Sequence, residues 1–81
     1  MKQVRRSDIL VQFGRAVRKR RIERGWSQEE FAEKAELHRT YVADIERGVR
    51  NVSLCNLDKI AKAFGVSLSA LFESIHNKGR E

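Results

Sequence analysis

Apolar residues recur along this chain at helical spacing, in five stretches separated by short polar breaks. In the first stretch, Leu10, Phe13 and Val17 stand at i, i+3 and i+7, so they share one face of a helix predicted from residue 7 or 8 to about residue 24. No stretch alternates apolar and polar residues with a period of two over the length of a strand, so no sheet is expected. The pattern predicts an all-α fold, a compact bundle of five short helices.

The start of the second helix is marked by the run WSQEEF. Ser27 and Glu30 have the spacing of a capping box, in which each side chain accepts a hydrogen bond from the backbone N–H of the other residue. Trp26 and Phe31 flank the box as a hydrophobic staple, which favours Trp26 as a residue of the core rather than a platform for a nucleic-acid base. This helix is expected over about residues 28–35.

Polar caps mark the other three helices. The third is expected over about residues 39–47, capped by His38, and the fourth and fifth begin after Ser53 and Ser67. Glycines at positions 25, 48 and 65 follow the first, third and fourth helices as left-handed stops. The last two helices have apolar faces formed by Leu54, Leu57, Ile60, Ala61 and Phe64, and by Leu68, Leu71, Phe72 and Ile75.

The length of 81 residues predicts one small domain, which we expect over residues 8–76, between a basic segment 1–7 and a frayed tail 77–81. A core of this size leaves only about 3–5 kcal/mol of net stability, which favours association with a second copy. The single cysteine, Cys55, is expected to be a small packed residue in a reducing cytoplasm. No apolar run approaches the ~20 residues that a membrane span needs, so no membrane partner is expected.

Charge is distributed unevenly along the chain. Seventeen Lys and Arg against eleven Asp and Glu give a net charge of +6, which is typical of a protein with a polyanionic partner. Residues 1–25 carry +7, residues 26–46 carry −4 and residues 47–64 carry +3. Contacts with phosphate are therefore expected from the basic flanks and from the few cations of the acidic middle. Composition alone also allows a basic surface that binds nothing in particular.

The third predicted helix has a polar face that a helix serving only the core would not need. Val42 and Ile45 lie on one side of its wheel, and the opposite stripe holds Arg39, Thr40, Ala43, Asp44 and Arg47. Residues 36–38 separate it from the second helix, a spacing typical of a helix-turn-helix whose second helix enters the major groove of DNA. Arginine can donate two hydrogen bonds to guanine and threonine can contact thymine, while a small Ala43 allows close approach. A merely solvated face is the alternative.

The run SQEEFAEKAELHRTYVADIERGVRN resembles the helix-turn-helix of the Xre/Cro/phage-repressor family. Its part HRTYVADIERGVRN is most similar to the controller proteins of bacterial restriction–modification systems, and the resemblance covers about residues 10–72. It implies a lambda-repressor-like fold and a transcription regulator that binds palindromic double-stranded DNA operators as a homodimer. It also implies control of a restriction–modification operon that includes the protein's own gene, RNA polymerase as a partner during activation, and a location on the bacterial nucleoid in the cytoplasm. No cofactor or metal is expected.

The resemblance also implies roles for individual positions. Base reading is expected at Arg39, Thr40, Ala43 and Asp44, and contacts with the DNA backbone at Gln28, Tyr41, Arg47, Arg50, Asn51 and Ser53. Gln28 stands in the first turn of a helix, where free backbone N–H groups favour an anion. A dimer interface is expected at Leu68, Leu71, Phe72 and Ile75, and a structural ion pair between Arg21 and Glu46.

Two positions depart from the family pattern. Arg20 stands where many members carry leucine or isoleucine, and Ile22 is the candidate to compensate in the packing of the first helix. Glu36 stands where the family often has glycine, which predicts a strained or altered turn.

Functions other than that of a controller protein are also open to this sequence. A generic Xre-family repressor, an antitoxin, and a protein-interaction module that keeps the fold are the alternatives. An enzyme is not expected, because the histidines His38 and His76 lie far apart and the sequence has neither a nucleophile–base pairing nor a glycine-rich phosphate loop.

Overall fold

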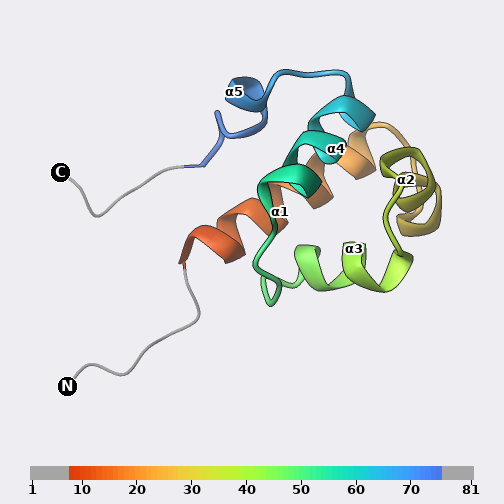
Figure 1. Cartoon of the computed structure of the whole chain (residues 1–81), viewed down its shortest axis with the longest axis horizontal. Coiled ribbons are helices and arrows are strands. Elements are labelled where there is room, and N and C mark those ends of the chain that lie inside the picture. Colours follow the sequence, from red (N-terminus) through yellow and green to blue (C-terminus); the bar gives the residue numbers. More distant parts are fainter. Residues whose placement is uncertain (1–7, 76–81) are drawn as a thin grey trace, which may run out of the picture.

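The structure, a computed structural model, describes residues 8–75 as five helices without a strand (Figure 1). The helices are α1 (Asp8–Glu23), α2 (Gln28–Ala35), α3 (Arg39–Glu46), α4 (Leu54–Phe64) and α5 (Leu68–Leu71). The all-α prediction is confirmed. The predicted segments 1–7 and 77–81, together with residue 76, lie outside the described residues.

The predicted caps set where the helices begin. Glu30 donates its backbone N–H to Ser27 Oγ at 2.9 Å, and Ser27 donates its own N–H to Glu30 Oε1 at 2.8 Å, so the capping box is closed in both directions. Ser53 and Ser67 each accept a hydrogen bond from the N–H three residues further on. Because these bonds satisfy N–H groups that have no partner inside the helix, they fix the first residues of α2, α4 and α5.

The helix ends agree with the predicted stops, except at α5. The glycines at 25, 48 and 65 have φ values of 72°, 75° and 72°. By contrast, α5 is a single turn that ends at Leu71, and residues 72–74 form a turn in place of the predicted helix to about residue 75. Only Leu71 of this segment is fully buried. The other apolar residues of the segment, Leu68, Phe72 and Ile75, are only partly buried, so burial stabilises a longer helix less.

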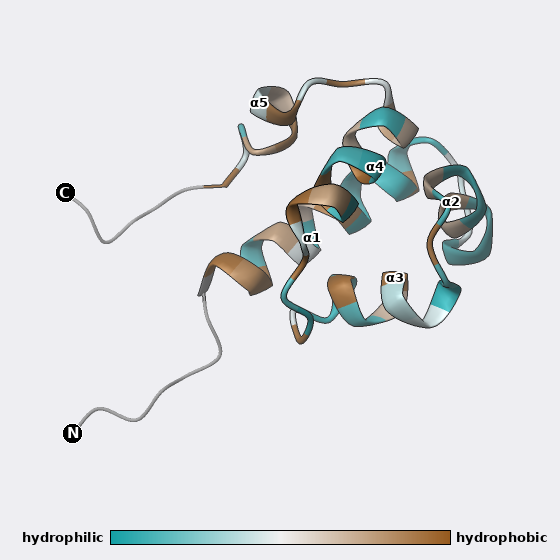
Figure 2. Ribbon diagram, in the orientation of Figure 1, coloured by the Kyte–Doolittle hydropathy of each residue, from teal (hydrophilic) through white to brown (hydrophobic). Residues whose placement is uncertain are grey.

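The core lies between α1, α2, α3 and α4 and is closed by α5. Figure 2 shows hydrophobic and hydrophilic residues interchanging along α1, α2, α3 and α4. The largest fully buried side chains of the core are Phe31, Ile45, Ile60, Leu71, Val17 and Val42. Trp26 stacks on Phe64 with ring centroids 5.8 Å apart, and Phe64 stacks on Phe31 at 4.7 Å. Trp26 is thus an edge residue of the core, as predicted.

Three residues lie elsewhere than predicted. Leu54, predicted on the buried face of α4, is 72% exposed, and Cys55, predicted to be packed, is an exposed free thiol. The fully buried residues of α4 all lie in its second half, so its first turn projects beyond the core. Ile22 is 50% exposed and therefore does not compensate for Arg20 inside the core.

The backbones of α1 and α3 meet at Gly14. A Cβ at this position would lie 2.3 Å from the backbone oxygen of Ile45 and 2.9 Å from that of Glu46. No side chain fits in that space, so glycine is required for α1 to support the C-terminal half of α3. Since α2 also packs on α3 and on α4, α3 is held from two sides.

Candidate nucleic-acid interface

The turn between α2 and α3 gives the two helices their relative orientation. Glu36 adopts the left-handed conformation, with φ 58° and ψ 43°, and is the sole non-glycine residue with positive φ in the described part of the chain. The predicted altered turn is confirmed. Leu37 packs against the core, and His38 Nδ1 accepts a hydrogen bond from the Thr40 N–H at 3.3 Å, which confirms His38 as the cap of α3.

The side chains of α3 separate into a buried and an exposed face. Val42 and Ile45 are 0% and 1% exposed, so they anchor the helix in the core. Arg39 and Thr40 are exposed at its first turn, and Ala43 is half-buried further along the same face. Within residues 8–75 the Arg39 guanidinium has no hydrogen-bond or ion-pair partner, so all of its donors are available to a ligand.

The inner side of α3 ends in a buried ion pair. Arg21 donates from Nε to Glu46 Oε2 at 2.6 Å and from Nη2 to Glu46 Oε1 at 3.0 Å, and both side chains are nearly buried. Arg21 also donates from Nη1 to the Trp26 carbonyl at 2.9 Å. The hydrogen bond to Glu46 raises the pKa of Arg21 above its ordinary value. Arg21, Gln28 and Glu46 form what we call the inner junction, where α1, α2 and α3 meet.

Gln28 belongs to this junction through its side-chain amide. Its Nε2 donates to Glu46 Oε1 at 3.0 Å. The resemblance implies a phosphate contact for Gln28, and one of its two amide hydrogens is already used inside the protein. The second hydrogen is the one that a phosphate can accept.

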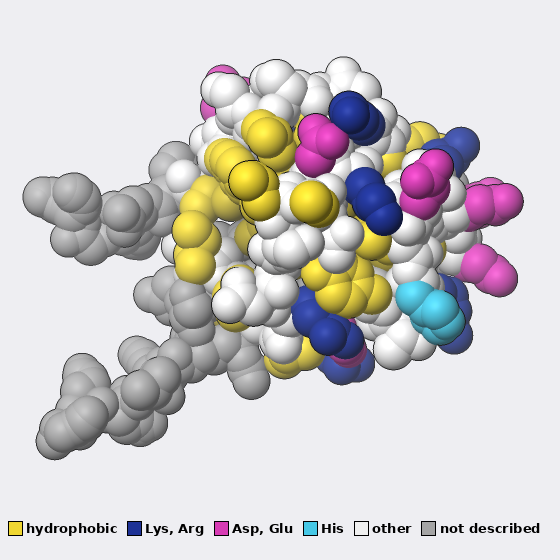
Figure 3. Space-filling view, viewed as in Figure 1, with side chains coloured by type: hydrophobic (Ala, Val, Ile, Leu, Met, Phe, Trp, Pro, Cys, Tyr) yellow, Lys and Arg dark blue, Asp and Glu magenta, His cyan; other side chains and the backbone are white. Residues whose placement is uncertain are grey.

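A second network, which we call the outer cluster, lies on the exposed side of α3 and consists of Tyr41, Asp44, Arg47, Arg50 and Asn56. Asp44 Oδ1 accepts from Arg47 Nη2 at 2.6 Å and Asp44 Oδ2 from Arg50 Nη2 at 2.9 Å. The Arg50 guanidinium lies 4.7 Å from the Tyr41 ring centroid, and the Tyr41 hydroxyl accepts from Asn56 Nδ2 at 3.0 Å. Figure 3 shows basic side chains gathered at the edge of the molecule where α3 lies.

Sequence reasoning missed the internal contacts of the outer cluster. Asn56 was not singled out, and no local signal links it to Tyr41, because the two residues are 15 positions apart in different helices. The pairing of Asp44 with Arg47 does have a signal, since residues at i and i+3 are neighbours on a helix surface.

The loop between α3 and α4 carries the remaining predicted backbone contacts. Asn51 and Ser53 are both exposed. Ser53 Oγ accepts from the Asn56 N–H at 3.1 Å as the cap of α4, which leaves its hydroxyl hydrogen free to donate. Together with Arg50, these groups form an exposed polar loop next to the outer cluster.

The predicted dimer residues lie around α5 and only in part on the surface. Leu71 is 0% exposed, so the prediction that it contacts a second copy is wrong: its side chain closes the core. Phe72 is 39% exposed, and Leu68 and Ile75 are half-buried. Phe72 and Ile75 border an apolar groove of about 200 Å³ between α1, α4 and α5, whose other lining residues are Ile9, Leu10, Phe13, Asn51, Val52 and Leu57.

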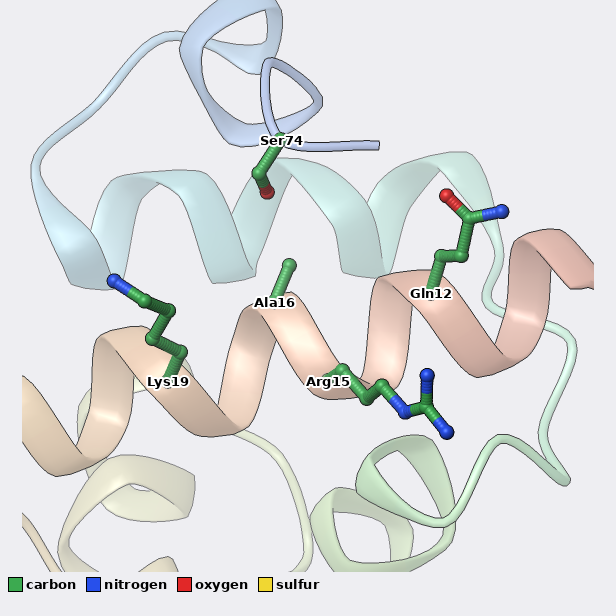
Figure 4. Close-up of a pocket in the computed structure, with 5 residues that line it drawn as sticks. All are labelled: Gln12, Arg15, Ala16, Lys19 and Ser74. Atoms are coloured by element: carbon green, nitrogen blue, oxygen red, sulfur yellow. The ribbon is translucent and has the colours of Figure 1, made fainter. Parts of the chain in front are cut away.

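Arg20, the departure from the family pattern, holds α5 against α1. Its Nη2 donates to the Ala70 carbonyl in α5 at 2.9 Å, and the same carbonyl also accepts a hydrogen bond from the Glu73 N–H at 3.1 Å. A shallow hollow of about 210 Å³ lies nearby and is lined by Gln12, Arg15, Ala16 and Lys19 of α1 and by Ser74. Ala16 and Ser74 point toward each other, whereas the Arg15 side chain points away from Ser74 (Figure 4). Lys19 also pairs with Glu23 at 2.5 Å and lowers the pKa of that carboxyl.

Residues 8–75 contain neither a cluster of metal-binding side chains nor a membrane-spanning helix. No group of three or more His, Cys, Asp or Glu side chains is placed to hold a metal ion. None of the helices is both long and apolar enough to cross a membrane.

Known proteins share both the sequence and the fold. The sequence pattern of the helix-turn-helix family matches residues 17–71. Control protein C.MunI from Mycoplasma sp is 47% identical over 73 residues, which cover 89% of this chain and 99% of that protein. The crystal structure of the restriction-modification controller protein C.AhdI from Aeromonas hydrophila has a TM-score of 0.75 at 46% identity, over 78% of this chain and 96% of that one.

The chain belongs to the helix-turn-helix family, among the controller proteins of restriction–modification systems. It is therefore a DNA-binding transcription regulator and not an enzyme. A related structure is that of the C.Esp1396I tetramer in complex with its natural 35 base-pair operator. It has a TM-score of 0.76 at 39% identity, over 83% of this chain and 88% of that chain.

Proposed function

We propose that this controller protein binds a palindromic operator as a homodimer and thereby regulates a restriction–modification operon that includes its own gene. The exposed face of α3 enters the major groove, with Arg39 and Thr40 reading base edges and Ala43 allowing close approach. The observation that carries this assignment is the Arg39 guanidinium, which is exposed at the first turn of α3 and has no partner among the described residues. RNA polymerase is a further partner when the protein activates, and the site of action is the nucleoid in the bacterial cytoplasm.

Contacts with the DNA backbone come from the groups around the base-reading face. Arg47 and Arg50 lie on the exposed side of α3 and in the loop that follows, and each retains N–H donors that no residue within 8–75 accepts. The Tyr41 and Ser53 hydroxyls and the Gln28 and Asn51 amides complete the set. These donors can hold phosphate oxygens and so fix the position of α3 without carrying sequence information.

A relative supports the assignment of residues 39–41. Solved structures of C.Esp1396I include variants in which an arginine, a threonine and a tyrosine, consecutive in that chain, are substituted one at a time. This chain has the same three residue types in the same order at Arg39, Thr40 and Tyr41.

The apolar groove beside α5 supports association of two copies. Phe72 and Ile9 are 39% and 57% exposed at its border, and Figure 3 shows hydrophobic side chains gathered on the side of the molecule where α5 lies. A second copy that covers this surface would stabilise a domain whose own core is small. Leu68, Phe72 and Ile75 are the α5-side residues of this proposed interface.

Selection of bound sequences from a pool of random DNA tests the proposal. The expected result is a palindrome whose half-sites are about one helical turn, ~34 Å, apart. Sedimentation of the protein with the selected duplex then gives the number of copies bound. Recovery of a single, non-repeated half-site at a stoichiometry of one would refute the homodimer, and recovery of no preferred sequence would refute base reading by α3.

A further inference from the structure

The outer cluster contains a carboxylate on the surface that is proposed to face DNA, where a negative charge repels phosphate. Asp44 lies in the second turn of α3, and its side chain is 18% exposed. Each of its oxygens accepts a hydrogen bond from a different arginine, Oδ1 from Arg47 and Oδ2 from Arg50. Both oxygens are thus engaged before any DNA is bound.

The arginines are much more exposed than the carboxylate that holds them. The side chain of Arg47 is 65% exposed and that of Arg50 is 43% exposed. A guanidinium has five N–H donors, and each of these arginines gives one to Asp44, so most of their donors remain on the open side. The carboxylate is therefore placed behind the guanidinium groups.

Arg50 has a second support, which comes from another helix. Its guanidinium lies over the Tyr41 ring, and the Tyr41 hydroxyl is held by Asn56 of α4. A long side chain in a loop would otherwise sample many rotamers, and fixing it beforehand reduces the entropy that is lost when a ligand binds.

We propose that Asp44 is a positioning residue that holds the guanidinium groups of Arg47 and Arg50 ready for the DNA backbone, and that it does not read a base. This inference rests on the proposed function of the same surface and replaces the expectation that Asp44 contacts a base edge. Asp44 also lowers the combined charge of the three side chains to +1, which limits their attraction for DNA of any sequence. It thereby favours the operator, where the fixed arginines are correctly placed, over random DNA.

The variants Asp44→Ala and Asp44→Asn test the inference, with Asp58→Ala as a matched control. Asp58 pairs with Lys62 on the exposed side of α4, so its loss removes the same charge outside the cluster. The asparagine keeps the shape of the side chain, which guards against a folding defect in the alanine variant. Affinities for the selected operator and for a random duplex of equal length are measured by fluorescence anisotropy over a range of salt concentrations.

For both Asp44 variants, the ratio of operator affinity to random-DNA affinity should fall, roughly threefold to tenfold, while Asp58→Ala leaves it unchanged. The bases selected from a random pool should stay those of the unsubstituted protein. In an Arg47→Ala, Arg50→Ala background, the further change of Asp44 should have little effect, because the groups it positions are absent.

Three results overturn the inference. Loss of sequence preference at one base pair in the Asp44 variants would show that Asp44 contacts a base. An unchanged affinity ratio would show that the ion pairs of Asp44 do not contribute to operator preference. An equal effect of the Asp44 substitution with and without the two arginines would show that Asp44 does not act through Arg47 and Arg50. Absence of sequence preference in the unsubstituted protein would instead refute the proposed function, and with it the role of Asp44.

Discussion

The inner junction and the outer cluster both consist of a carboxylate on α3 that binds guanidinium groups, but they differ in burial. The side chain of Glu46 is 4% exposed and its partner Arg21 is 11% exposed, whereas Asp44 is 18% exposed and its partners are 43% and 65% exposed. A buried pair that loses one member leaves an uncompensated charge, while exposed charges are solvated and screened. The same hydrogen-bond chemistry therefore stabilises the fold on one side of α3 and, as we propose, positions arginines for DNA on the other.

The largest effect is expected from Glu46→Ala, which breaks the inner junction. The change leaves the Arg21 guanidinium nearly buried without its partner and should lower the free energy of unfolding by about 3–5 kcal/mol. Urea denaturation followed by circular dichroism measures this. Asp58→Ala, which breaks the exposed pair with Lys62, should cost only about 0–1 kcal/mol. Equal losses in the two variants would contradict the role given to burial.

Arg39→Ala should have the next largest effect, and on binding rather than on folding. Loss of a two-bond contact with guanine is expected to cost about 1–3 kcal/mol of operator affinity and to relax the preference at one base pair per half-site. Selection from random DNA, together with anisotropy on the operator, measures both. Arg18→Ala removes the same charge from an exposed position on α1 and serves as the control. Intact discrimination by Arg39→Ala would refute its assignment as a base reader.

Arg50→Ala tests whether the outer cluster contacts the DNA backbone or the bases. Because Arg50 is proposed to hold a phosphate, its loss should weaken the binding of both operator and random duplexes, and more strongly that of the operator, where Asp44 is proposed to place Arg50 correctly. The slope of log affinity against log salt should fall by about 1. Binding to operator and random duplexes at several salt concentrations gives both slopes. A loss confined to the operator would mean that Arg50 contacts a base.

The smallest effect is expected at a position outside both networks. Glu36→Gly relieves the left-handed conformation of a residue with a Cβ, which should raise the free energy of unfolding by about 0.5–1 kcal/mol. Operator affinity should not change, and thermal denaturation with a binding assay checks the two quantities separately. A change in affinity would show that the turn geometry itself contributes to DNA binding.

Local features of this fold are readable from the sequence, and features set by distant contacts are not. The capping box at Ser27 and the serine caps depend on a few neighbouring residues and follow from spacing, and the altered turn at Glu36 follows from the family resemblance. The exposure of Leu54 depends on how far the core extends along α4. The spacing of apolar residues in α4 does not predict that extent.

The candidate site shows the same division. The polar face of α3 and the positions of Arg21 and Glu46 follow from the helical wheel and from the family resemblance. The burial of Leu71 and the contact of Arg50 with the Tyr41 ring depend on the path of the chain after α3 and α4, so neither is visible in the sequence.

The direct backbone contact at Gly14 limits how this protein can acquire a new target sequence. Since a Cβ at Gly14 would clash with the backbone of Ile45 and Glu46, no side chain can be placed between α1 and α3 at this point. If α3 is the recognition helix, as we propose, a lineage that changes its operator is expected to do so by exchanging the side chains at the tip and along the open face of α3. Sets of such exchanges, made on an unchanged scaffold, are the natural starting point for redesigning its specificity.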